Sequence, residues 1–316
     1  MKGMILAAGF GTRLRPITHT LPKPMVPLCN RPLIAWAIES LHAAGVRDLI
    51  VNVHHLPEAI EKYVRATYDR VDFSYEQEIL GTGGAIRRVR PLLEGEEAFF
   101  LVNGDTVQFP HWSTLREALG DNIAALTLRH APENDRFTPV YLQSGKVTGF
   151  GKGSGEALLF AGSHLISTRV FQHLPDEEEF GIVDRVYEPL LAGGRETIAG
   201  IVDDGLWFDI GTPQRYVGAS RGLLDAMIRG ELTPPAGSHL DGDSLLHESA
   251  AGHATRSILG ARTTVRGDVR DSVVWDDCVI EGTLERCIVA HGVHVTGTHR
   301  DELIVQDAVV PLSPSS

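Results

Sequence analysis

A glycine-rich loop near the N-terminus carries the clearest signs of chemistry in this sequence. The loop contains Gly9 and Gly11, and it follows a short apolar run, Met4 to Leu6, that predicts a buried strand. Glycines let backbone N–H groups come close to a phosphate chain or a flat base. Three cations follow the loop: Arg13, Arg15 and Lys23. Cations beside a glycine loop indicate a polyphosphate site.

The residues of the loop distinguish it from two common phosphate-binding motifs. It lacks the Gly-Lys-Ser/Thr ending of a Walker A loop. It also lacks a complete dinucleotide fingerprint, because Leu14 stands where that fingerprint needs its third glycine. A bare Gly-x-Gly also fits a tight turn with solvated charges, and on the residues alone both interpretations stay open.

The first two-thirds of the chain alternate between strand-like and helix-like segments. We expect helices at 31–44, 57–68, 83–93, 182–192 and 214–229. We expect strands at 4–6, 49–53, 71–75, 98–102, 124–128, 140–142, 147–150, 158–166, 198–202 and 206–210. This alternation predicts a mostly parallel sheet with helices on both faces and ligands at the carboxyl ends of its strands. Gly9 and Asp105 both follow strands, so both are expected to face one crevice.

The C-terminal part of the chain has a different texture. Residues 230–256 are rich in Gly, Pro, Ser, Asp and His, which predicts a linker with some loose structure. Residues 257–310 contain short β-branched pairs at irregular intervals of about six residues or a multiple, as in a degraded hexapeptide repeat. We expect a short parallel β-helix here, and the alternative is an irregular β tail packed on the preceding domain.

Bulk composition excludes several classes of protein. A net charge of −12 argues against a nucleic-acid partner, which needs a basic face. No apolar run approaches a membrane span, so no membrane partner is expected. Three cysteines, Cys29, Cys278 and Cys287, form no zinc or disulfide pattern. A cytoplasmic location is the simplest expectation.

The N-terminal loop resembles a known signature. Leu-Ala-Ala-Gly-x-Gly-Thr-Arg-Leu-Arg-Pro followed by Pro-Lys-Pro-Met is similar to the signature of the sugar-1-phosphate nucleotidylyltransferases, and further matches reach about residue 225. The resemblance implies attack of a sugar 1-phosphate oxygen on the α-phosphorus of a nucleoside triphosphate, giving NDP-sugar and pyrophosphate. Because two anions must meet, charge neutralisation and alignment are the main tasks.

The resemblance also implies roles for individual charged residues. Asp105 in Val-Asn-Gly-Asp matches the family aspartate that holds Mg²⁺, and Asp209 in Trp-Phe-Asp-Ile-Gly-Thr-Pro matches the second carboxylate. Mg²⁺ commonly takes one or two carboxylates together with phosphate oxygens and waters. Arg13 matches the arginine that contacts the departing pyrophosphate, and Lys23 matches the lysine that supports the phosphates during transfer.

The predicted nucleotide site combines the glycine loop with a second loop that ends in Leu-Gly-Thr-Gly-Gly. Its expected members are Leu6, Ala7, Ala8, Gly9, Gly11, Thr12, Glu76, Gly81 and Thr82. Glu76 stands where many thymidylyl and uridylyl members carry Gln, and a carboxylate there fits guanine N1–H and the 2-amino group. Glu76 and Glu78 form a Glu-x-Glu pair that resembles that of mannose-1-phosphate guanylyltransferases, but N-acetylmuramate-1-phosphate uridylyltransferases share a similar acidic pair. Glu76 as a plain surface charge is a further alternative.

The sugar side of the site departs from the family pattern. We expect Asn103, Lys152 and Gly162 at the sugar phosphate, with Gly162 leaving room for the ring. Gly151 replaces the glutamate that usually holds sugar hydroxyls, and Gly153 replaces the proline of the family's Glu-Lys-Pro. The identity of the sugar therefore stays open.

The resemblance completes the expected architecture and activity. The fold class is α/β, a Rossmann-like mixed and mostly parallel sheet, with a short C-terminal left-handed parallel β-helix. The expected domains are 1–229 for catalysis, 230–256 as linker and 257–316 as the β-helix, which is expected to support a homo-oligomer. We favour Mg²⁺-dependent transfer from GTP to mannose 1-phosphate or a related sugar. The alternatives are a uridylyltransferase (UTP with a hexose, amino-sugar or N-acetylmuramate 1-phosphate) and a non-catalytic NDP-sugar-binding regulatory subunit.

Overall fold

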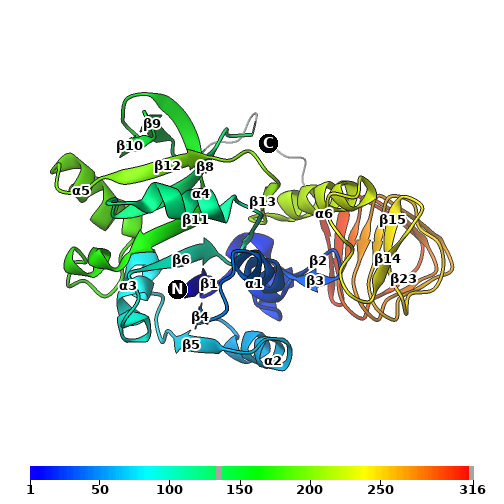
Figure 1. Ribbon diagram of the computed structural model, residues 1–316. Helices are drawn as coiled ribbons and strands as arrows, with labels where there is room; N and C mark the ends of the chain where they lie inside the picture. The colour runs from blue at the N-terminus through cyan, green and yellow to red at the C-terminus, as the bar shows by residue number, and fades with distance from the viewer. Residues whose placement is uncertain (133–136, 313–316) are drawn as a thin grey trace. The chain divides into compact units, whose positions relative to one another are not determined.

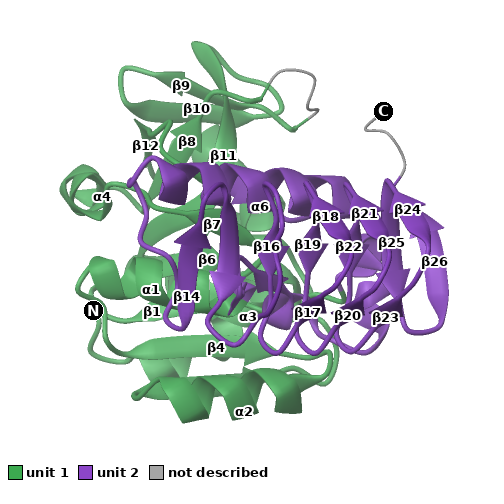
Figure 2. Cartoon of the chain, turned by 90° about the vertical axis from the view of Figure 1, so that its right-hand side faces the viewer, with its two compact units in different colours: residues 1–10, 34–207 green, residues 11–33, 208–316 purple. Residues whose placement is uncertain are grey.

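The computed structural model describes residues 1–132 and 137–312, and these fall into two units that do not follow chain order. Unit 1 comprises residues 1–10 and 34–207, and unit 2 comprises residues 11–33 and 208–316 (Figure 2). The segment with Arg13 and Lys23 therefore groups with the C-terminal part of the chain. The division at 229 and 256 expected from the sequence stays a prediction.

Unit 1 is built on a nine-stranded sheet in the order β5-β4-β1-β6-β11-β8-β12-β10-β9 (Figure 1). The strands are β1 (Gly3–Leu6), β4 (Leu49–Val53), β5 (Val71–Tyr75), β6 (Ala98–Asn103), β8 (Ala124–Arg129), β9 (Val140–Gln143), β10 (Lys146–Phe150), β11 (Glu156–Ser167) and β12 (Ile198–Val202). Parallel pairing joins β5, β4, β1 and β6, and also β8 and β12, whereas β11 is antiparallel to both neighbours. β10 is antiparallel to β12 and β9, and β9 also pairs antiparallel with β11. The expected mixed sheet is confirmed, but within the described residues its parallel pairings (four) do not outnumber its antiparallel ones (five).

Helices cover both faces of this sheet. They are α1 (Leu33–Ala43, all but its first residue in unit 1), α2 (Pro57–Thr67), α3 (Gly81–Arg88), α4 (Trp112–Leu119) and α5 (Glu188–Ala192), with the short helices η4 (Arg90–Leu93), η5 (Thr168–Gln172) and the π-helix η6 (Val183–Tyr187). Phe99 and Leu101 pack with Ile86 of α3 on one face. Phe100 lies between these two residues along β6 and therefore points to the other face, where its ring centroid lies 4.9 Å from that of Trp112 of α4.

Two predicted helices have different boundaries in the structure, and one helix was missed. The helix expected at 83–93 ends at Arg88, and a 3-10 turn follows, because Pro91 has no backbone N–H to continue the α-helical hydrogen bonds. The helix expected at 182–192 begins as the π-helix η6. The sequence analysis did not predict α4, although Trp112 and Leu115 on this short helix are buried.

Unit 2 begins with a chain of tight turns. Its first elements are η1 (Thr12–Leu14), η2 (Ile17–His19), η3 (Lys23–Met25), β2 (Pro27–Leu28) and β3 (Arg31–Pro32). The hairpin of β2 and β3 turns through Cys29 and Asn30, whose φ angles are 50° and 60°, as a type I′ turn requires. The chain re-enters unit 2 from β13 (Trp207–Asp209), and α6 (Pro213–Ile228) follows.

The remainder of unit 2 is a parallel β-helix with three strand rows. Its strands are β14 (Ser238–Asp241), β15 (Ser244–His247), β16 (Ile258–Leu259), β17 (Thr264–Val265), β18 (Asp268–Arg270), β19 (Val273–Val274), β20 (Val279–Ile280), β21 (Thr283–Glu285), β22 (Ile288–Val289), β23 (His294–Val295), β24 (Thr298–Arg300), β25 (Glu302–Val305) and β26 (Ala308–Pro311). The rows are β14-β15-β16-β19-β22-β25-β26, β17-β20-β23 and β18-β21-β24. β14 and β15 lie within the segment expected to be a linker, and β15 pairs with β16.

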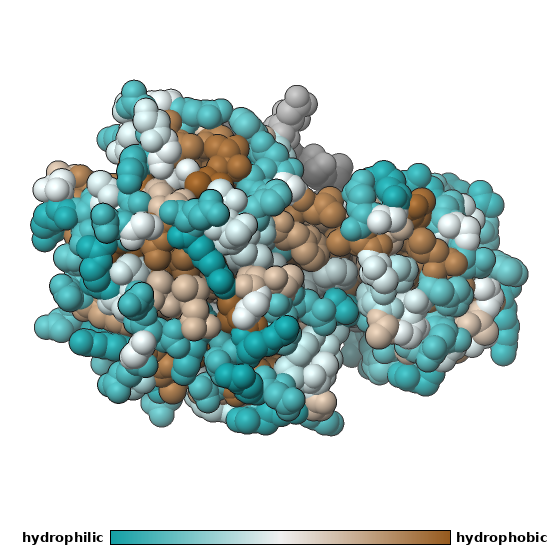
Figure 3. Space-filling view, in the orientation of Figure 1, coloured by the Kyte–Doolittle hydropathy of each residue, from teal (hydrophilic) through white to brown (hydrophobic). Residues whose placement is uncertain are grey.

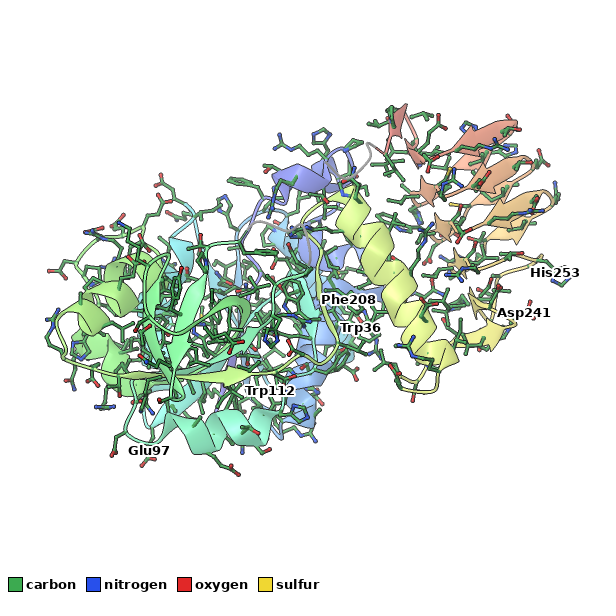
Figure 4. All side chains as sticks on the ribbon, turned by 90° about the horizontal axis from the view of Figure 1, so that it is seen from above. Trp36, Glu97, Trp112, Phe208, Asp241 and His253 are labelled. Atoms are coloured by element: carbon green, nitrogen blue, oxygen red, sulfur yellow. The ribbon has the colours of Figure 1, made fainter. Side chains whose placement is uncertain are left out.

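The β-helix repeats every 15 residues, which is shorter than a coil of three hexapeptides. Ile258 pairs with Val273, and Val273 pairs with Ile288. This shorter coil explains why the β-branched pairs are irregularly spaced in the sequence. Polar residues cover most of the face seen in Figure 3, and the apolar rows point inward. Asp241 and His253 lie side by side on the first coils, with 3.8 Å between Asp241 Oδ2 and His253 Nδ1 (Figure 4).

A row of buried serines joins successive coils of the β-helix. The Ser257 hydroxyl accepts from Ser272 N at 3.0 Å, and the Ser272 hydroxyl accepts from Cys287 N at 3.0 Å. Ser257 and Ser272 are each 1% exposed, so water cannot serve these backbone groups. The side chains complete the hydrogen bonding at a corner where the strand ladder is interrupted.

Candidate active site

The carboxyl end of β1 lies between two parallel strands, and the glycine-rich loop begins there. Ala7 and Ala8 are buried, whereas Phe10 is 45% exposed. The space that a Cβ at Gly9 would occupy is open with respect to the described residues, so packing does not demand a glycine there. This open backbone position is what close approach of a ligand requires.

The Asn103-Gly104-Asp105 segment lies directly beside the end of β1. Leu6 pairs in register with Asn103, and Gly104 N donates to the Leu6 carbonyl oxygen at 2.9 Å. A Cβ at Gly104 would stand 2.6 Å from that same oxygen, so a side chain here would push the segment away. Gly104 thus brings Asp105, the predicted metal ligand in unit 1, next to Leu6 at the start of the predicted nucleotide site.

The predicted base-side loop leads into α3, and its glycines are fitted against Phe180. Gly83 N donates to the Phe180 carbonyl oxygen at 2.9 Å, and Gly81 has a φ of +67°. A Cβ at Gly83 would clash with the Phe180 ring. The glycine run is therefore required by packing, which also uses the N–H groups of Gly83 and Gly84 in the first turn of α3.

Glu76, at the start of this loop, is only 5% exposed. Its Oε1 accepts from Asn52 Nδ2 at 2.7 Å, and its Oε2 accepts from Leu80 N at 3.0 Å. The alternative that Glu76 is a surface charge is wrong. Asn52 Oδ1 in turn accepts from Ala7 N at 2.8 Å, so hydrogen bonds connect the glycine loop to the base-side loop.

The structure brings together two of the predicted sugar-side residues. Gly162 has a φ of +89°, and its missing Cβ would stand 2.6 Å from Asn103 Nδ2, so the glycine admits the Asn103 amide. Lys152 is exposed in the turn that follows β10. Gly151 has a φ of +68°, and its N–H donates to the Pro139 carbonyl oxygen at 2.7 Å. A left-handed turn explains the glycine at this position, where the family pattern has glutamate.

Unit 2 contains the predicted catalytic cations. Gly11 adopts a φ of 62° at the start of η1, and its carbonyl oxygen accepts from the Thr18 hydroxyl at 2.8 Å. A Cβ at Gly11 would stand 2.9 Å from the Cβ of Lys23, which is 6% exposed. Gly11 therefore packs directly against the aliphatic stem of Lys23, whereas the Arg13 side chain is exposed.

Asp209 lies among positive charges within unit 2. Its Oδ2 forms an ion pair with Arg215 of α6. A Cβ at Gly211 would stand 3.2 Å from both Asp209 Oδ2 and Arg13 Nη1, so the predicted carboxylate and the predicted arginine flank this glycine. Thr212 caps α6 by accepting from Arg215 N at 3.3 Å, which fixes the start of the helix behind Asp209.

Carboxylate oxygens are the ligands that Mg²⁺ prefers, and Asp105 and Asp209 supply one such group in each unit. Across residues 1–132 and 137–312, no three His, Cys, Asp or Glu side chains gather as a dedicated metal cage. A site of one or two carboxylates completed by phosphate oxygens and waters does not need such a cage. The donor chemistry therefore fits Mg²⁺ bound together with a nucleotide.

The turn ahead of β13 is held by two histidines. His111 Nδ1 lies 2.8 Å from Asp203 Oδ2, and His130 Nδ1 lies 2.7 Å from Asp204 Oδ2. His130 Nε2 also lies 3.0 Å from Glu156 Oε1 on β11. The hydrogen bond to Asp204, followed by the one to Glu156, raises the pKa of His130.

Comparison with known proteins identifies the family. A family model described as nucleotidyl transferase matches residues 2–226. The chain belongs to the nucleotidyl transferase family. This transferase is 29% identical to a probable mannose-1-phosphate guanylyltransferase 2 of Oryza sativa subsp. japonica, over 93% of this chain and 82% of the relative. It is 30% identical to a mannose-1-phosphate guanyltransferase of Hypocrea jecorina, over 79% of this chain and 72% of the relative.

A solved structure shares the fold of this nucleotidyl transferase. HddC from Yersinia pseudotuberculosis, complexed with GMP-PN, matches with a TM-score of 0.60 at 24% identity. The match covers 70% of this chain and 99% of that chain. The family predicted from the N-terminal loop is confirmed. In the described part of this transferase, no helix is long and apolar enough to cross a membrane.

The sequence analysis missed several residues that shape the site. Asn52 is a polar residue inside the apolar strand Leu49–Val53, and that contrast was an available signal. Arg215 stands in the first turn of α6, six positions after Asp209, and only the fold shows that the two meet. Phe180 lies about a hundred residues from the glycines that it packs against, so no local pattern could indicate it.

Proposed function

We propose that this nucleotidyl transferase transfers GMP from GTP to mannose 1-phosphate, giving GDP-mannose and pyrophosphate. The observation that carries the proposal is the match to mannose-1-phosphate guanylyltransferases over as much as 93% of the chain. It is supported by the presence of Arg13, Lys23, Asp105 and Asp209, because a non-catalytic regulatory subunit has no need of all four.

In the proposed reaction, an oxygen of the sugar 1-phosphate attacks the α-phosphorus of GTP. The new O–P bond forms as the bond from the α-phosphorus to the pyrophosphate oxygen breaks, and no protein nucleophile takes part. Asp105 and Asp209 would hold Mg²⁺, which would supply positive charge to the phosphate oxygens. Arg13 is proposed to bind the departing pyrophosphate, and Lys23 to support the phosphates during transfer.

The remaining proposed contacts position the two substrates. The nucleotide lies along Leu6, Ala7, Ala8, Gly9, Gly11 and Thr12, with Glu76, Gly81 and Thr82 on the base side. Asn103, Lys152 and Gly162 serve the sugar phosphate, where the charge of Lys152 offsets that of the attacking group. The β-helix is proposed to support a homo-oligomer, and the native mass in solution tests that part separately.

The direct test is pyrophosphate release with Mg²⁺ across GTP, UTP, dTTP, CTP and ATP, each paired with common sugar 1-phosphates. GTP with mannose 1-phosphate is expected to give the highest turnover. Preferred turnover of UTP with a hexose, amino-sugar or N-acetylmuramate 1-phosphate would replace the proposal by its uridylyl alternative. Silence across the matrix, with measurable nucleotide binding, would favour the regulatory alternative.

A further inference from the structure

The strand β4 contains one buried polar side chain close to the nucleotide loop. Asn52 is 3% exposed and lies beside Leu6 in the parallel register of β1 and β4. Its amide makes two hydrogen bonds, accepting from Ala7 N at 2.8 Å and donating to Glu76 Oε1 at 2.7 Å. An amide buried in this way contributes only when both of its ends are matched.

Glu76 is held from several sides by groups of the protein itself. Besides the bond from Asn52, its Oε2 accepts from Leu80 N at 3.0 Å. The Glu76 backbone N donates to the Val53 carbonyl oxygen at 2.8 Å, and the Glu76 carbonyl oxygen lies 2.9 Å from His54 Nδ1. Each carboxylate oxygen therefore already has a donor from the protein, and the side chain is almost wholly covered.

We infer that Asn52 and Glu76 form a positioning pair that sets the glycine loop against the base-side loop, and that the Glu76 carboxylate does not itself discriminate between bases. The pair holds Ala7 N at one end and Leu80, the residue before α3, at the other. Base preference then depends on the groups that these loops present to the ligand. The inference rests on the proposed function for its catalytic readout.

The direction of the hydrogen bonds in this pair allows a specific test of the inference. The hydrogen bonds converge on Glu76 from two sides: Ala7 N donates to Asn52, and Asn52 and Leu80 N each donate to one carboxylate oxygen of Glu76. Glu76→Gln leaves one acceptor for two donors, so one contact becomes donor against donor. Asn52→Asp sets two carboxylates against each other. In the double variant, the carboxylate at position 52 accepts from Ala7 N and from the amide at position 76, and the oxygen of that amide accepts from Leu80 N. Every donor again faces an acceptor, and the net charge equals that of the wild type.

The experiment measures kcat/KM with GTP and with UTP for the wild type, both single variants and the double variant. Each single variant is expected to lose about tenfold or more in kcat/KM, because one buried partner is left unmatched. The double variant is expected to recover to within about threefold of the wild type, with the GTP-to-UTP ratio unchanged throughout. Glu117→Gln, the same chemical change at an exposed position of α4 outside both loops, is the matched control and should stay near the wild type.

Two outcomes would overturn the inference. One is a double variant as impaired as Glu76→Gln alone; the other is a GTP-to-UTP ratio that shifts toward UTP in both variants carrying Gln at position 76. Inactivity of the wild type with GTP and every sugar would count against the proposed function instead. In that case urea unfolding of the same four proteins tests the positioning pair. The double variant should lose less free energy of unfolding than the sum of the losses in the two single variants, and additive losses would reject the pair.

Discussion

The Tyr216 hydroxyl connects Trp275 of the β-helix to the hairpin of β2 and β3. It accepts from Trp275 Nε1 at 2.9 Å and donates to the Pro27 carbonyl oxygen at 2.6 Å. Tyr216 is fully buried, and Trp275 is 6% exposed. Asn30 of the same hairpin donates to the Leu259 carbonyl oxygen at 3.0 Å. The β-helix therefore fixes the chain only a few residues after Lys23.

Replacing Tyr216 by Phe tests this connection. The change removes one hydroxyl and leaves the buried Trp275 N–H and the part-buried Pro27 carbonyl oxygen without this partner, so unfolding should become easier by about 1–3 kcal/mol. Urea unfolding measures the loss. Tyr75→Phe removes a hydroxyl that meets Glu61 at the exposed surface and should cost less than about 0.5 kcal/mol. Equal effects of the two substitutions would contradict the role given to Tyr216.

The two predicted metal ligands are tested by removing one charge at a time. Asp105→Asn and Asp209→Asn should each lower Mg²⁺-dependent turnover on the order of 100-fold, because charge stabilisation at the phosphates is lost. Circular dichroism should remain that of the wild type. Asp72→Asn, at an exposed position of β5, serves as the control. A variant with near-normal turnover would take its aspartate out of the metal site.

Lys152 is predicted to act on the sugar phosphate and not on the nucleotide. Lys152→Ala should raise KM for the sugar 1-phosphate by about tenfold or more, since a single charge-assisted contact is removed, and should leave KM for GTP nearly unchanged. Lys62→Ala, an exposed lysine of α2, provides the comparison. Unaltered sugar kinetics in the Lys152 variant would exclude the predicted contact.

His130 is expected to make the stability of unit 1 depend on pH. Hydrogen bonds to Asp204 and Glu156 raise its pKa above the ordinary value of 6.5. A raised pKa means that the stability gained from protonated His130 is complete below the unfolded-state pKa and is lost as pH rises through the folded-state pKa. The Tm difference between wild type and His130→Gln should therefore be larger at pH 5.5 than at pH 8.5. An NMR titration of His130 with a midpoint at or below 6.5 would refute the assignment.

Two glycines of α6 should respond to alanine with opposite signs. A Cβ at Gly218 meets no described atom within 4 Å, so Gly218→Ala should stabilise the helix by about 0.5–1 kcal/mol. A Cβ at Gly222, one turn later, would clash with the ring of Phe208, which Figure 4 labels. Gly222→Ala should therefore destabilise the protein. Unfolding curves of the two variants provide the measurement, and shifts in the same direction would contradict this packing.

The sequence predicted the parts of this protein that depend on local pattern. The strand Leu49–Val53 has the expected bounds, because an apolar run between polar segments specifies a buried strand without outside help. The loop signature likewise predicted the family, and the β-helix followed from its short β-branched pairs. The 15-residue period of the β-helix could not be predicted, since a coil with strands of two or three residues leaves only a weak local signal.

Contacts between distant segments could not be predicted in this way. Glu76 is a charged residue in a polar loop segment, and no local pattern predicts that it is buried and accepts a hydrogen bond from Asn52. The same holds for Asp209 and Arg215, whose ion pair depends on how α6 starts. Tertiary packing decided each of these positions, and it acts between residues whose separation along the chain follows no fixed rule.

The grouping of residues 11–33 with residues 208–316 has a consequence for how the protein is made. The segment with Arg13 and Lys23 is among the first to be synthesised, yet its packing partners arrive about two hundred residues later. At 5–20 residues per second the ribosome needs roughly 10 to 40 seconds to supply them. During that interval β1 can already pair with β4 and β6, whereas residues 11–33 still lack the C-terminal residues with which they group, so a nascent chain forms the centre of its sheet before it packs this segment.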